Sequence, residues 1–126
     1  MLGGAKLTAF VATTDSARSK AFYQGILGLR LLTDDQFALA FDSNGTQLRI
    51  QKVERLQPPP FTVLGWEVSN VRQAVRALAR AGVRFERYDF LEQDDLGIWK
   101  APSGTKVAWF KDPDANLLSV AESGAA

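Results

Sequence analysis

The sequence predicts an α+β protein of two tandem βαβββ modules, which together form a concave, mostly antiparallel sheet with the helices on its outer faces. Two observations predict this fold. The order of a strand, a capped helix and further strands occurs twice. A segment with three consecutive prolines, residues 54–60, separates the two copies and cannot continue a sheet. We therefore expect a single domain, residues 1–126, built of repeat modules at about residues 5–54 and 61–122.

The first copy begins with a strand rich in Val, Thr, Phe and Ala, at residues 5–14. Asp15 is a good N-cap for the helix that follows, and Gly28 ends that helix. Three further strands are expected at residues 29–33, 37–41 and 47–53. The turns between them are Asp34-Asp35 and Ser43-Asn44-Gly45.

The second copy repeats this order. A strand at residues 61–68 leads to Asn70, which caps a helix whose apolar side chains recur at helical spacing. Gly82 ends the helix, and a strand is expected at residues 83–88. The two capping residues are 55 positions apart, whereas the acidic turns before the last strands are 69 apart. The second copy therefore carries about 15 extra residues, which must lie within residues 90–104.

The composition narrows the possible functions. The net charge of +1 gives no electrostatic reason to expect nucleic acid or an anionic membrane as a partner. No apolar run is long enough to span a membrane, so we expect a cytoplasmic protein. The chain has no histidine and no cysteine. Zinc, copper or iron sites with nitrogen or thiolate ligands are therefore excluded, as are Ser-His and Cys-His nucleophiles.

Two motifs resemble those of the vicinal oxygen chelate superfamily, which includes glyoxalase I, extradiol dioxygenases and bleomycin-resistance proteins. DSARSKAFYQGILGL, at residues 15–29, is similar to the D-x3-S-x2-FY-x3-LG signature of that family. FKDPDAN, at residues 110–116, is similar to its F-x-DPDG-N turn. The resemblance extends from about residue 7 to residue 122. It implies a glyoxalase-like domain of paired βαβββ modules and a homodimer, and leaves the reaction open.

The resemblance also locates the positions from which catalytic relatives chelate a divalent metal. These lie on the first and last strands of each half, and in this chain they are Thr8, Arg49, Val63 and Ser119. Valine has no donor atom, and arginine carries a permanent positive charge that repels a cation. Magnesium requires oxygen ligands, usually including carboxylates. We therefore expect no metal site, no cofactor and no catalytic residues of the family's type.

The residues expected on the inner face are instead candidates for binding a ligand. Strand alternation predicts that Arg49 points inward, where it either anchors a ligand carboxylate or phosphate or pairs with Glu67. Aromatic side chains in the inserted segment and the following hairpin suit a planar, apolar compound. The full candidate set is Arg49, Glu67, Thr8, Ser119, Gln51, Trp99 and Trp109. Asp112 and Asp114 resemble metal ligands by type, but DPDAN is read as a tight turn.

We therefore expect a metal-independent protein that binds a small organic molecule, of the glyoxalase/bleomycin-resistance type, and sequesters an aromatic or anionic compound. One alternative is a metal-dependent lyase, isomerase or dioxygenase of the same superfamily that uses oxygen ligands. Another is a dimeric accessory or regulatory module without a ligand. The sequence favours the binding protein over an enzyme because the four family metal positions lack a chelating set.

Overall fold

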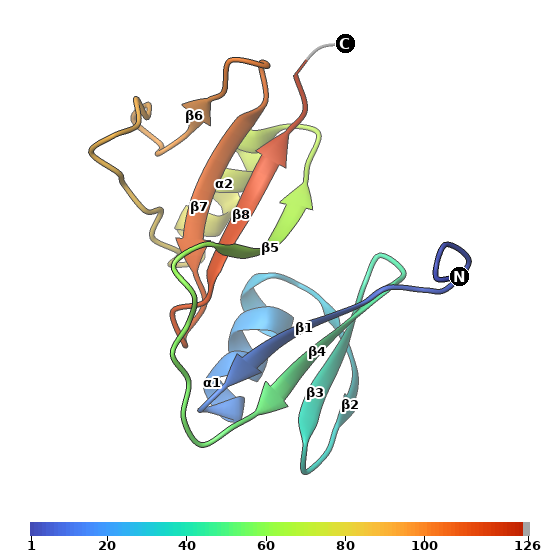
Figure 1. Ribbon diagram of the computed structural model, residues 1–126. Coiled ribbons are helices and arrows are strands. Elements are labelled where there is room, and N and C mark those ends of the chain that lie inside the picture. Colours follow the sequence, from blue (N-terminus) through green and yellow to red (C-terminus); the bar gives the residue numbers. More distant parts are fainter. Residues whose placement is uncertain (125–126) are drawn as a thin grey trace. The chain divides into compact units, whose positions relative to one another are not determined.

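The computed structural model describes residues 1–124, which form two compact modules that meet at Gln57 and Pro58 (Figure 1). The first module contains β1 (Thr8–Thr13), α1 (Ser16–Lys20), the π-helix η1 (Ala21–Ile26), β2 (Arg30–Asp34), β3 (Ala38–Ser43) and β4 (Thr46–Lys52). Its four-stranded sheet has the order β1-β4-β3-β2. β1 and β4 are parallel, and the other neighbours are antiparallel.

The second module repeats this arrangement. It contains β5 (Thr62–Glu67), α2 (Val71–Arg80), β6 (Trp99–Lys100), β7 (Lys106–Lys111) and β8 (Leu117–Glu122). The sheet order is β5-β8-β7-β6, with β5 parallel to β8. The predicted α+β class and the tandem modules are therefore confirmed, and each module has its own mixed sheet. No helix within residues 1–124 has the length and apolar character needed to cross a membrane.

Both predicted helix caps are present. The carboxylate of Asp15 accepts a hydrogen bond from the backbone N–H of Arg18 at 3.2 Å, and Asn70 accepts one from Gln73 at 3.1 Å. These bonds satisfy amides that have no partner within the helix. The first helix is not α-helical throughout, because from Ala21 it continues as η1. The backbone N–H of Leu27 donates five residues back, to the carbonyl of Phe22.

The expected strand at residues 83–88 is wrong. This segment makes only an isolated bridge, between Phe85 and Phe110, and β6 within the inserted residues is the edge strand instead. The reason is that the side chain of Gln93 takes the place of the backbone hydrogen bonds that a neighbouring strand would make. Gln93 Oε1 accepts a hydrogen bond from the N–H of Tyr88 at 2.7 Å, and its Nε2 donates to the carbonyls of Glu86 and Gly97. The inserted segment thus hydrogen-bonds to the backbone of Glu86 and Tyr88, which lie in the strand predicted from the sequence.

Side-chain alternation gives each sheet one face that packs beneath the helix of its own module and one opposite face, which we call the helix-free face. On the covered faces, the buried residues include Val11, Leu48, Ile50, Leu118 and Val120. In the first module Tyr23 of η1 packs on Phe41 of β3, with ring centroids 6.0 Å apart. The residues predicted to point inward lie on the helix-free faces. The predicted orientation agrees with the alternating burial of β4, whereas in β8 Ser119 on the helix-free face is buried as well.

The DPDAN segment is a tight turn, as predicted. Asp112 is buried, and its Oδ1 accepts hydrogen bonds from the backbone N–H groups of Asp114 and Asn116, both at 2.9 Å. Its Oδ2 accepts another from the side-chain amide of Asn116. The carboxylate is therefore committed to the turn. Ala115 has a φ of +67°, in the left-handed region that favours glycine.

Replacing Ala115 with glycine is expected to stabilise the protein. The left-handed conformation costs a residue with a Cβ about 1–2 kcal/mol, and the greater freedom of glycine in the unfolded chain returns about 0.4–1 kcal/mol of this. We expect the free energy of unfolding to rise by roughly 0.5–1 kcal/mol in urea denaturation. A matched Ala108→Gly change, in a strand with no such backbone strain, should destabilise the protein. A fall in stability for Ala115→Gly would contradict this account of the turn.

Candidate ligand-binding site

Three candidate residues lie together on the helix-free face of the first sheet. Thr8 is the register partner of Gln47, and Arg49 lies between Phe10 of β1 and Ala40 of β3. Gln51 is two residues further along the same strand and is exposed. Phe10 is also 54% exposed. This face therefore offers an aromatic ring next to a guanidinium group.

Within its own module, Arg49 acts electrostatically on the carboxylate of Asp35. Hydrogen bonds from the backbone amides of Phe37 and Ala38 are the main cause that lowers the pKa of Asp35, and the positive charge of Arg49 contributes to that lowering. Among residues 1–124 the guanidinium makes no hydrogen bond and no salt bridge. Its donors therefore remain available to an oxyanion, whose recognition would be bidentate.

The helix-free face of the second sheet brings Ser119 together with Trp109. These two residues are register partners across β7 and β8, and Gly65 is the partner of Ser119 on the other side. Ser119 is buried, and a Cβ added at Gly65 would lie only 2.8 Å from its Oγ. Glu67 is two residues beyond Gly65 and accepts a hydrogen bond from the hydroxyl of Ser123. The space beside Gly65 is thus occupied by the Ser119 hydroxyl.

Both tryptophans of the candidate set belong to one aromatic cluster, formed by Trp99, Trp109, Tyr88 and Phe90. The ring centroids of Trp99 and Trp109 are 6.0 Å apart with their planes inclined at 33°. Tyr88 meets Trp109 edge-on at 5.7 Å and contacts Phe90 at 5.5 Å. Phe90 is 81% exposed. The cluster therefore forms an apolar aromatic wall on the helix-free side.

Polar contacts hold this wall in position. The indole N–H of Trp109 donates to Thr62 Oγ1 at 3.1 Å, which fixes the orientation of the ring. Arg87 donates to the carbonyls of Asp94 and Asp95, so it fastens the inserted loop together with Gln93. Burial raises the pKa of the Tyr88 phenol, and the nearby Glu86 carboxylate adds to this effect. The phenol therefore stays protonated and can donate a hydrogen bond at neutral pH.

Sequence reasoning did not identify Tyr88 and Phe90 as part of this group. In the structure the backbone N–H of Glu86 donates to the carbonyl of Trp109, which places the segment that contains Tyr88 beside β7. An alternating pattern through residues 83–88 would have put Tyr88 next to Trp109. Phe90 gave no such signal, since it lies in the irregular insertion.

The comparisons with known proteins agree with this architecture. A family model described as Glyoxalase/Bleomycin resistance protein/Dioxygenase superfamily matches residues 7–120. The chain belongs to this superfamily. A comparison with curated proteins finds no match.

Solved structures of the superfamily share the fold at low sequence identity. Lactoylglutathione lyase from Agrobacterium tumefaciens is 14% identical, with a TM-score of 0.75 over 97% of this chain and 96% of that one. TnmS3, an antibiotic binding protein from Streptomyces sp. CB03234, is 21% identical, with a TM-score of 0.75 over 98% and 99%. A superfamily member from Sphaerobacter thermophilus is 21% identical, with a TM-score of 0.74 over 98% and 100%. At these identities the likeness shows the fold alone.

The family's metal positions do not fit a divalent cation in this chain. Thr8 and Ser119 offer only neutral hydroxyl oxygens, and Val63, which lies in a register shift of β5, offers no donor. Arg49 would place a positive charge beside the ion. Within residues 1–124 there is no group of three or more carboxylates placed to share a metal ion. These four residues therefore do not provide a suitable site for a divalent metal ion.

Proposed function

We propose that this superfamily member binds a small organic molecule with a planar aromatic part and does so without a metal. The observation that carries the proposal is the aromatic cluster on the helix-free face of the second sheet. Trp99 and Trp109 are 6.0 Å apart and mutually inclined, so they present ring faces and edges to a flat ligand. The fold is shared with TnmS3, an antibiotic binding protein, which supports sequestration as the purpose of binding.

The immobility of the cluster favours binding. The hydrogen bond from Trp109 to Thr62 and the bonds of Gln93 fix the ring positions before a ligand arrives. A preformed wall avoids most of the ordering cost that binding otherwise incurs. Gly65 lets Ser119 pack closely against β5, because a Cβ at this position would lie 2.8 Å from Ser119 Oγ.

On the helix-free face of the first sheet, considered by itself, Arg49 is the proposed contact for an oxyanion. Its donors make no salt bridge within residues 1–124, and Gln51, Thr8 and Gln47 on the same face can accept or donate further hydrogen bonds. A carboxylate or phosphate would match the guanidinium with two parallel bonds. The proposed assembly is the homodimer implied by the resemblance, with binding counted per chain.

Titration of tryptophan fluorescence tests the proposal. A panel of planar aromatic acids, their neutral alcohols and aromatic antibiotics is added to the full chain. We expect at least one class of compound to quench the fluorescence saturably. Its Kd should be micromolar, which corresponds to a binding free energy of about −8 kcal/mol. An Arg49→Gln variant, followed by isothermal titration calorimetry with the same panel, should lose binding of the acids to the first sheet and leave the fluorescence response of the second module unchanged. Absence of any saturable change at high micromolar ligand, in folded protein, would reject the proposal.

A further inference from the structure

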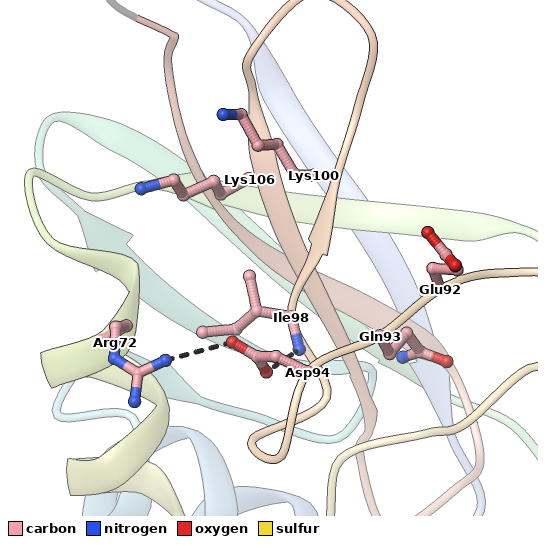
Figure 2. A pocket seen from close by; sticks show the side chains of 7 residues that line it. All are labelled: Arg72, Glu92, Gln93, Asp94, Ile98, Lys100 and Lys106. Carbon is pink, nitrogen blue, oxygen red and sulfur yellow. Dashed lines mark hydrogen bonds and ion pairs between the residues drawn. The ribbon is translucent and has the colours of Figure 1, made fainter.

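A second polar site lies on the opposite face of the second sheet from the aromatic cluster. Trp99 and Lys100 are adjacent in β6, so their side chains point to opposite faces. Lys100 is the register partner of Lys106 in β7, and Lys106 is the partner of Glu122 in β8. Two ammonium groups are therefore neighbours at the α2 side of the sheet edge (Figure 2).

This lysine pair is only partly compensated. Like charges directly opposite each other in antiparallel strands are destabilising. Glu122 is the nearest carboxylate, with its Oε2 4.0 Å from Lys106 Nζ, but its Oε1 accepts a hydrogen bond from the N–H of Val71 at the start of α2. Within residues 1–124 Lys100 forms no salt bridge. The two lysines therefore keep a net positive charge, because Glu122 neutralises them only in part.

Two cavities meet at these lysines. One, of about 390 Å³, extends toward Arg72, whose charge is already paired with Asp94 at 3.1 Å. Glu92 also lines this cavity, and in Figure 2 its side chain lies apart from both ammonium groups.

The other cavity, of about 370 Å³, carries the donors that suit an oxyanion. Besides the lysines and Glu122 it is lined by Ser103, Gly104, Ser123 and Gly124. A Cβ at Gly124 would lie 2.8 Å from the carbonyl oxygen of Ser103, so the two backbone segments approach closely here. The two ammonium groups are the principal donors for a phosphate here, because the Gly104 N–H donates to the carbonyl of Ala101 and the two serine hydroxyls also donate within the chain.

We propose that Lys100 and Lys106 hold a phosphate group in this 370 Å³ cavity. A dianion placed between the two ammonium groups removes their mutual repulsion, whereas a monovalent carboxylate neutralises only one of them. Ser103 and Ser123 line the same cavity, and their hydroxyls, which donate to Thr105 and Glu67, would have to turn to reach a phosphate. The site is independent of the proposed aromatic ligand, because strand alternation separates the two by the thickness of the sheet.

Two-dimensional 1H–15N spectra of the full chain, titrated with inorganic phosphate, test this site. We expect saturable shifts confined to residues 100–106 and 122–124. The Lys100→Gln/Lys106→Gln variant should bind at least roughly tenfold more weakly. The matched control is Lys6→Gln/Lys111→Gln, which removes the same charge outside both cavities and should bind as the wild type does. Phenyl phosphate in place of inorganic phosphate distinguishes an organic phosphate ligand from the free ion.

Three outcomes would overturn the proposal. The first is no shift at about 10 mM phosphate, which would detect even millimolar affinity. The second is an equal loss of binding in both double variants, which would indicate general charge attraction. The third is full binding by Lys100→Gln alone. This single variant keeps the test decisive even where the double variant does not fold. Lys100 forms no salt bridge within residues 1–124, so we expect its replacement to leave the fold intact.

Discussion

Replacing Phe110 with alanine is expected to lower the free energy of unfolding by about 3–5 kcal/mol. Phe110 lies on the covered face of β7, is fully buried, and packs edge-on against Phe85 with ring centroids 5.6 Å apart. Truncation removes this buried area and leaves a cavity that the neighbouring side chains of β7 and β8 can fill only partly. Total stabilities of domains are about 5–15 kcal/mol, so a large fraction would be lost. Urea denaturation followed by far-UV circular dichroism measures the change.

The matched control is Phe61→Ala, the same truncation in the same module. Phe61 is 61% exposed, so its loss should alter stability by no more than about 0.5 kcal/mol. A Phe110→Ala variant as stable as Phe61→Ala would show that the covered face of the second sheet is not the core described above.

Replacing the adjacent residue, Trp109, with alanine should affect ligand binding more than stability. Trp109 is half-buried on the helix-free face, where it contacts Trp99 and Tyr88. We expect the Kd for the aromatic ligand found in the fluorescence panel to rise roughly 30-fold, which corresponds to about 2 kcal/mol for an aromatic anchor. Because Trp109 supplies part of the fluorescence signal, isothermal titration calorimetry is the appropriate measurement.

Trp66→Phe is the control for this binding experiment. Trp66 is in β5 and alternates with Gly65, so it lies on the face opposite the cluster. This variant should keep wild-type affinity. Equal affinity of the Trp109→Ala protein and the wild type would exclude the aromatic cluster as the binding surface, whatever the ligand.

Local signals in the sequence were sufficient for most of the first module. Asp15 caps its helix through a contact three residues away, and the Asn44-Gly45 turn adopts the positive φ angles that this residue pair favours. Alternation then identified the buried and helix-free faces of β4 and β8. The π-helical continuation was missed, because consecutive burial of Phe22 and Tyr23 depends on what the sheet presents to them.

The second module was harder to predict where distant groups replace regular pairing. Gln93 binds the backbone of residues 86, 88 and 97 through its side-chain amide, and no local pattern distinguishes it from any other loop glutamine. The lysine pair depends on the register of β6 with β7, which the turn at residues 101–105 sets. The Pro102-Ser103-Gly104 sequence is typical of such a turn. Only the pairing that follows from it was beyond the sequence.

The parallel pairing of β1 with β4 has a consequence for the order in which the chain folds. Every strand of the first sheet has been synthesised once Lys52 is added, ten residues before β5 begins at Thr62. The emerging first module therefore needs no hydrogen-bond partner from the part of the chain still on the ribosome. Synthesis from the N-terminus lets it close its sheet first. The duplication thus divides one slow search for distant strand partners into two short searches made in succession.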